Sequence, residues 1–176
     1  MANREALREL QTRLASRLKA ARTEGVSVAW LAVSAAGINY LLPLGQSGEI
    51  FPLANLQPVP YSQDWFRGVL NIRGGLYGVV DFAAFLAAES GTARQAATLT
   101  DSSVVTLNPA LEVNCALQVD SLLGLRGAEA FASMQAPDPG TPAFFGNCFV
   151  DASGGKWQEI NLRTLSLTPQ FLSISA

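Results

Sequence analysis

Leucines recur three and four positions apart near the start of the chain, which is the spacing of one face of an α-helix. They are Leu7, Leu10, Leu14 and Leu18, and arginine and glutamate occupy many of the positions between them. This pattern predicts an amphipathic helix over residues 3–22, with Asn3 as its candidate N-cap and Gly25 as the signal that ends it. We expect the helix to pack on its own domain, and docking on a partner protein is the alternative.

After residue 25 the pattern changes to short apolar runs separated by Gly, Pro and Asn, which is typical of an all-β domain. The sequence therefore predicts two regions, an N-terminal helix over residues 1–25 and a β domain over residues 26–176. The predicted strands are Val26–Val33, Ile38–Leu44, Ile50–Leu53, Gly68–Ile72, Leu76–Phe82, Val104–Leu107, Leu111–Val119, Phe144–Val150 and Trp157–Leu162.

Three pairs of these strands are expected to form hairpins. The pair Gly74-Gly75 suits a two-residue turn because glycine accepts a positive φ, and the other turns are expected at Asn108-Pro109 and at 153–155. Apolar and polar residues alternate along residues 111–119, so one face of that strand must be buried. Residues 133–142 contain three prolines and a glycine, and they predict a loop.

Two segments of the β domain look related. VVDFAAFL at 79–86 and EINLRTL at 159–165 each end a strand and pass directly into a short helical turn. They suggest two similar barrel units, each closed by such a turn. Closure would also remove the exposed sheet edges that a small β protein must otherwise protect.

Composition and charge narrow the classes of function. Apolar residues make up 49% of the chain and charged residues 15%, which favours protein contacts. The net charge is −2, but the first 24 residues hold six of the twelve cations against three acids, so the rest of the chain is acidic. Binding of nucleic acid is therefore disfavoured, because it needs clustered Lys and Arg. The sequence has no apolar run long enough to cross a membrane and no signal-peptide pattern, so we expect a cytoplasmic protein.

The residue types that catalysis and metal binding use most are scarce. The chain has no histidine, and its two cysteines, Cys115 and Cys148, lie in apolar runs where buried thiols are expected. Asp81 and Asp120 end apolar strands, where aspartate usually forms turns. The glycines after Arg73 lack the Lys-Ser/Thr of a phosphate-binding loop. We therefore expect no enzyme activity, no cofactor and no metal.

The most specific pattern runs from Gly37 to Leu86. Gly37 and Tyr40 share a strand, Glu49-Ile50 follows a turn, and WFRGVLNIRGGLYGVVDFAAFL follows from residue 65. Its Phe-x-Gly-Val-x-Asn-x-Arg-Gly and Val-Val-Asp resemble the signature of the CheW-domain chemosensory coupling proteins. The second half resembles the family more loosely, in LQVDSLLGL at 117–125 and FFGNCFVDASGGKW at 144–157. The N-terminal helix and the ending PQFLSIS resemble the PilI branch, which serves type IV pilus systems.

The resemblance implies a mainly β fold of two intertwined five-stranded SH3-like barrels. It also implies a non-enzymatic adaptor that couples methyl-accepting receptors to a CheA-type histidine kinase in the control of twitching motility. The receptor's cytoplasmic tip would bind between the barrels, and the kinase's regulatory domain would bind at one barrel end.

The same resemblance implies the partner-binding residues, which are Glu49, Phe66, Gly68, Ile72, Arg73 and Gly74. It pairs Glu49 with Arg73 in a salt bridge, and Gly68 matches a position associated with receptor docking. Ser47 departs from the family, which has an apolar residue there.

The rival interpretation is a small β-barrel that binds an oligosaccharide or a nucleic acid. Such sites expose aromatic side chains beside basic residues. Here the aromatic residues mostly lie in apolar strands, where burial in the core is expected: Trp30, Tyr40, Trp65, Phe66, Phe82 and Trp157.

Overall fold

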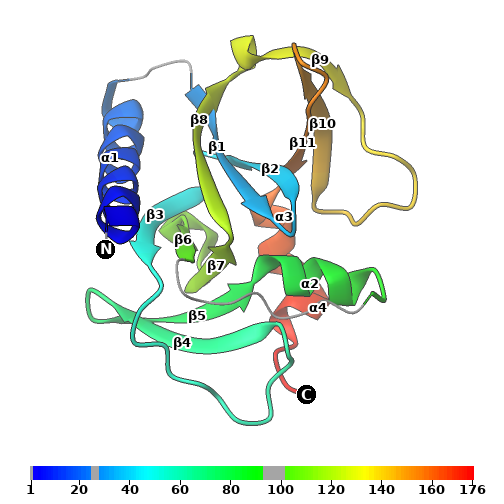
Figure 1. Ribbon diagram of the computed structural model, residues 1–176. Coiled ribbons are helices and arrows are strands. Elements are labelled where there is room, and N and C mark those ends of the chain that lie inside the picture. The colour runs from blue at the N-terminus through cyan, green and yellow to red at the C-terminus, as the bar shows by residue number, and fades with distance from the viewer. Residues whose placement is uncertain (1, 25–27, 93–101) are drawn as a thin grey trace.

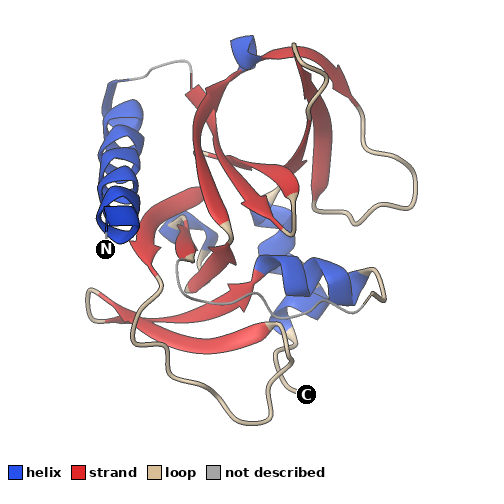
Figure 2. Cartoon of the chain, viewed as in Figure 1, coloured by secondary structure: helices blue, strands red, loops and turns tan. Residues whose placement is uncertain are grey.

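A computed structural model describes residues 2–24, 28–92 and 102–176. It is mainly β, with two sheets and a long N-terminal helix, as the sequence predicts (Figure 2). The helices are α1 (Ala2–Glu24), α2 (Phe82–Glu89), α3 (Leu162–Leu167) and α4 (Pro169–Leu172), with 3-10 turns η2 (Pro109–Leu111) and η3 (Ala128–Ala130). The strands are β1 (Val28–Ala35), β2 (Ile38–Pro43), β3 (Ser47–Pro52), β4 (Phe66–Ile72), β5 (Gly75–Asp81), β6 (Ser103–Leu107), β7 (Cys115–Val119), β8 (Ser121–Gly127), β9 (Phe131–Gln135), β10 (Phe145–Asp151) and β11 (Lys156–Ile160).

The two sheets are nested in the chain. The first sheet has six strands in the order β8-β1-β2-β11-β10-β9, and the second has five in the order β3-β6-β7-β5-β4. The chain therefore starts in the first sheet, builds the whole second sheet, and returns to complete the first (Figure 1). This nesting agrees with the predicted intertwined units.

Closure of the two units is not observed. Both ladders of the described residues are open, with β8 and β9 at the edges of the first sheet and β3 and β4 at the edges of the second. The first sheet has six strands among the described residues, where the resemblance implied five. The sequence pattern also did not predict β8 or β9. Part of the predicted loop over 133–142 therefore belongs to strand β9, which ends at Gln135.

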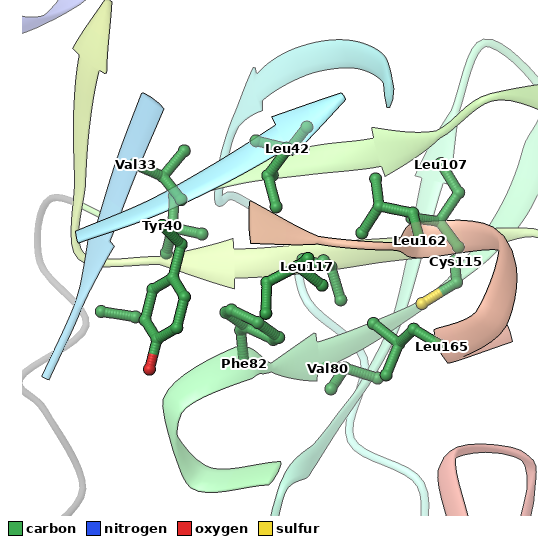
Figure 3. Close-up of a cluster of buried hydrophobic side chains, with 14 of the residues drawn as sticks. Val33, Tyr40, Leu42, Val80, Phe82, Leu107, Cys115, Leu117, Leu162 and Leu165 are labelled. Atoms are coloured by element: carbon green, nitrogen blue, oxygen red, sulfur yellow. The ribbon is translucent and has the colours of Figure 1, made fainter. Parts of the chain in front are cut away.

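Each sheet contributes side chains to a shared core from one face and to a smaller cluster from the other. Figure 3 shows side chains of both sheets and of α2 and α3 meeting in the shared core, among them Val33, Tyr40, Leu42, Val80, Phe82, Leu107, Cys115, Leu117, Leu162 and Leu165. The opposite face of the first sheet buries Ala32, Leu41, Phe149 and Trp157. The opposite face of the second sheet buries Leu70, Val79, Val104 and Ala116.

The apolar–polar alternation over 111–119 predicted one buried face, but both faces of the strand are buried. All five residues of β7 are buried, including Ala116 and Gln118 at the positions between the apolar ones. The predicted strand begins only at Cys115, because Leu111 ends the turn η2 and residues 112–114 form no regular structure.

The two related segments form equivalent junctions. Strand β5 runs parallel to β7 and leads into α2, and β11 runs parallel to β2 and leads into α3. Asp81 accepts a hydrogen bond from Ala84 N at 3.0 Å, and Asn161 accepts one from Thr164 N at 3.0 Å. These N-caps satisfy backbone donors of the first helical turn, which is why a strand can pass into a helix without a loop.

Helix α1 packs on its own domain, as expected, against β3 and β8. Leu14 and Leu18 join the shared core, and the Gln11 side chain donates a hydrogen bond to Ser103 Oγ at 2.6 Å. Asn3 lies inside the helix, so it is not the N-cap, and Gly25 lies outside the described residues. Among the described residues, no helix has both the length and the hydropathy to cross a membrane.

Candidate partner-binding site

The predicted salt bridge between Arg73 and Glu49 is present. Arg73 Nη1 donates to Glu49 Oε1 at 2.7 Å, and the guanidinium also lies 5.7 Å from the centre of the Phe51 ring. The two side chains are 72% and 48% exposed, so solvent screens the pair. An exposed pair of this kind contributes about 0–1 kcal/mol to stability.

A β-bulge points Glu49 outward. The register of β3 against β6 shifts between Ser47 and Ile50, and Glu49 N donates to Thr106 Oγ1 at 2.7 Å. Bulges commonly re-aim a side chain in this way. Ser47 is fully buried, and its hydroxyl donates to Pro43 O at 2.9 Å.

Arg73 occupies a tight turn in a left-handed backbone conformation. Ile72 pairs with Gly75, so the turn residues are Arg73 and Gly74, with φ of 50° and 83°. The prediction of Gly74-Gly75 was wrong by one residue. A non-glycine residue in this conformation costs about 1–2 kcal/mol, and Asn71 Oδ1 compensates in part by accepting from Gly74 N at 3.1 Å.

The ion pair borders a hollow of about 460 Å³ between α1 and the second sheet. Glu49, Phe51 and Arg73 line one side, and α1 lines the other with Thr12, Ala15, Ser16 and Lys19. Sequence reasoning missed these helix residues as neighbours of the pair. No local pattern reveals a contact between segments so far apart in the chain.

The structure does not bring all six predicted residues together. Glu49, Ile72, Arg73 and Gly74 gather at the turn between β4 and β5. Phe66 lies at the other end of β4 and is buried.

Gly68 is buried as well, for a reason within the chain itself. Its φ is +132°, and a Cβ there would collide with Gln57 O, where the segment before β4 pairs with Val69. Glycine in a strand often marks the close approach of another backbone, and at Gly68 that backbone is residues 57–58. A direct partner contact at Phe66 or Gly68 stays a prediction.

The remaining candidate chemistry is structural. Burial raises the pKa of the Cys115 thiol to about 12 and raises the pKa of Tyr40. Both cysteines are free, with Cys115 buried and Cys148 half-buried. Asp120 accepts a hydrogen bond from Ala36 N at 2.7 Å, as a turn residue does. Within the described ranges, no group of three or more Cys, Asp or Glu is arranged to hold a metal ion.

The aromatic residues lie mainly in the core, as expected. Tyr40, Trp65, Phe66, Phe82 and Trp157 are each at most 9% exposed, and Trp30 is half-buried against Phe131 and Phe149. Five of these six rings are therefore too buried to stack on a ligand.

A model of the CheW-like domain family matches residues 29–154. This chain belongs to that family. The matched range contains the Glu49–Arg73 pair and the β4–β5 hairpin, and it leaves α1 and β11 outside.

Two similar proteins extend this assignment. Protein PilI of Pseudomonas aeruginosa is 27% identical over 114 residues, which cover 65% of this chain and 61% of PilI. The crystal structure of the scaffolding protein TtCheW from Thermoanaerobacter tengcongensis superposes with a TM-score of 0.61 at 18% identity. That match covers 77% of this chain and 89% of TtCheW, and it establishes the shared CheW fold.

Proposed function

We propose that this CheW-like protein couples the cytoplasmic tips of methyl-accepting receptors to the regulatory domain of a CheA-type histidine kinase, in the cytoplasm. We further propose that the coupled system controls type IV pilus twitching motility, because the similarity to PilI extends over most of the chain. Such coupling needs two binding surfaces, one for the receptor and one for the kinase, whose occupation favours the same arrangement of contacts. It needs no chemical step.

The observation that carries the proposal is the backbone conformation of Arg73 together with its exposed ion pair. An exposed arginine sits in a left-handed turn, at a cost in backbone energy, with its charge held by Glu49 beside a hollow. The ion pair itself is too exposed to repay that cost through stability. Backbone strain that stability does not explain is concentrated at functional sites, so we assign the Glu49–Arg73 pair to the partner interface.

A double-mutant cycle tests this assignment. Arg73→Ala, Glu49→Ala and the double variant would be compared in receptor-dependent activation of the kinase, with membranes carrying the receptor. Because a partner that covers the pair removes it from water, each single change should reduce activation about tenfold or more. The same changes should alter the free energy of unfolding by less than about 1 kcal/mol.

The chain offers a matched control. Arg13 and Glu9 form an ion pair on α1, 3.7 Å apart, whose side chains are 70% and 75% exposed, and their alanine variants should leave activation unchanged. The double variant at Glu49 and Arg73 should be less impaired than the two singles combined, because the residues act as a pair. Normal activation by both singles would remove the pair from the interface, and strictly additive losses would mean that the residues act separately.

A further inference from the structure

Helix α1 lies across the boundary between the two sheets. It contacts β3, an edge strand of the second sheet, and β8, an edge strand of the first (Figure 1). Residues 29–154 carry the family match, and α1 lies outside that range. One long helix therefore covers a groove whose two walls belong to different sheets.

The contact that holds α1 in this groove is small. Among residues 4–19, only Gln11, Leu14 and Leu18 are buried, and Leu10 is 43% exposed although it belongs to the leucine stripe. Gln11 makes the polar contact with Ser103. Most of a helix's stability in a protein comes from packing of its apolar face, and here two buried leucines supply most of that packing.

Hollows run along both sides of the helix. Besides the 460 Å³ hollow beside Arg73, one of about 310 Å³ lies between Leu10 and Leu122, and one of about 290 Å³ lies between Arg8 and Leu53. These hollows are open to solvent, so the sheets cover the two flanks of α1 incompletely. The helix is held mainly along the line of Gln11, Leu14 and Leu18.

The floor beneath α1 is largely apolar, with Ser103 as a polar contact of Gln11. Leu122 and Leu125 of β8 are partly buried and pack against the shared core, which also includes Ile50 of β3 and the two buried leucines of α1. Without the helix, this floor would face water between two sheet edges. Its natural occupant is a helix with aliphatic residues three and four positions apart, which is the pattern of α1 itself.

We propose that the groove between β3 and β8 is a helix-binding site, that α1 is its resident occupant, and that a partner helix with the same aliphatic spacing takes its place. The proposal rests on the proposed function only for the identity of that partner, which would be a helix of the receptor tip. Displacement would open the hollow beside Glu49 and Arg73 at the same time. The apparent affinity for the partner is then reduced by the small fraction of molecules in which α1 has left the groove.

Hydrogen exchange of the unaltered full chain is the first test. Amides of residues 11–18 should exchange through a local opening, well before those of β1, β2 and β11, because the helix can leave while the sheets stay folded. Exchange of these amides only together with the sheet amides would overturn the proposal. This measurement needs no variant that might fail to fold.

A labelled peptide of residues 2–24 is the probe for the groove itself. It should bind a full-chain variant carrying Leu14→Ala and Leu18→Ala at least about tenfold more tightly than it binds the unaltered chain, because the weakened helix leaves the groove more often. The peptide carrying the same two substitutions is the matched control and should not bind. Equal binding of the peptide to variant and unaltered chain would overturn the proposal.

Ala15→Leu provides the opposite change. Ala15 lines the 460 Å³ hollow, so a leucine there should fill space, slow the exchange of residues 11–18 and weaken peptide binding to the full chain. Faster exchange in this variant would contradict the proposal that poor packing lets α1 leave the groove. None of these measurements involves a receptor or a kinase, so they decide the role of α1 even if the coupling experiment fails.

Discussion

The hairpins β4–β5 and β10–β11 are built on one plan, and they differ at the turn that we propose binds a partner. Equivalent positions lie 80 residues apart, so that Asn71 corresponds to Asp151, Gly74 to Gly154, and the helix caps Asp81 to Asn161. In both, the second strand runs parallel to a distant strand and ends in a capped helix.

The turns of these hairpins are stabilised differently. Asp151 accepts hydrogen bonds from Ser153 N, Ser153 Oγ, Gly155 N and Trp157 Nε1. Residues of the second hairpin itself therefore hold its turn in place. Asn71 accepts one bond, from Gly74 N, and the residue in the place of Ser153 is Arg73, whose side chain reaches out to Glu49. One turn is built for stability, and the other keeps a charged side chain available at the surface.

The largest effect should come from the residues that start the two helices. Phe82 and Leu162 are fully buried in the shared core, at equivalent positions. Phe82→Ala should cost about 3–5 kcal/mol and Leu162→Ala about 2–5 kcal/mol in the free energy of unfolding. Because one core joins both hairpins, each variant should lower a single denaturation midpoint. Two separate transitions in chemical denaturation would show that the hairpins belong to independently folding halves.

A smaller difference is expected within the first strands of the hairpins, at Gly68 and its equivalent Cys148. A Cβ at Gly68 would collide with Gln57 O, so Gly68→Ala should cost about 1–3 kcal/mol. Cys148 is half-buried and free, so Cys148→Ala should cost less than about 1 kcal/mol. Thermal unfolding of both variants measures the difference. A mild Gly68→Ala would leave partner contact as the better reason for a glycine there.

Much of this comparison could be predicted from the sequence. The related segments at 79–86 and 159–165 identified both junctions, because a short polar cap after an apolar strand is a local signal. No comparable local pattern predicts β8 and β9. Gly124, which has a positive φ, interrupts β8, and β9 is largely exposed, so it lacks a run of buried apolar residues. The resemblance identified the Glu49–Arg73 pair, but the neighbouring wall formed by α1 depends on packing between distant segments. Local patterns carry no information about that packing.

The two turns should also differ in their response to pH. Hydrogen bonds from the Ser153 hydroxyl, then from Trp157 and Gly155, lower the pKa of Asp151 to about 2. A carboxyl with a lowered pKa contributes stability that is present above its unfolded pKa and is lost as the pH falls towards about 2. The stability advantage of the unaltered chain over Asp151→Asn should therefore shrink as the pH is lowered from about 5 to about 2. Asn71 cannot titrate, so an Asn71→Ala variant should show no such change, and a constant advantage over Asp151→Asn would contradict the role of the carboxylate.

The smallest effect on stability, and the sharpest contrast between the turns, should come from glycine at the equivalent positions Arg73 and Ser153. Arg73→Gly relieves a left-handed backbone that costs about 1–2 kcal/mol, while it removes an exposed ion pair worth about 0–1 kcal/mol. The unfolded chain gains freedom with glycine, which offsets part of the relief. The free energy of unfolding should therefore stay within about 1 kcal/mol of the unaltered value. Ser153→Gly removes the hydroxyl that bonds Asp151 and relieves no left-handed strain, so it should lower stability. Chemical denaturation measures the free energy of unfolding of both variants. Receptor-dependent kinase activation then shows whether each variant still couples receptor to kinase. Arg73→Gly should keep its stability and lose coupling, whereas Ser153→Gly should lose stability and keep coupling. If Arg73→Gly instead destabilised the protein as much as Ser153→Gly does, Arg73 would be a structural residue of its turn and the functional contrast between the hairpins would fail.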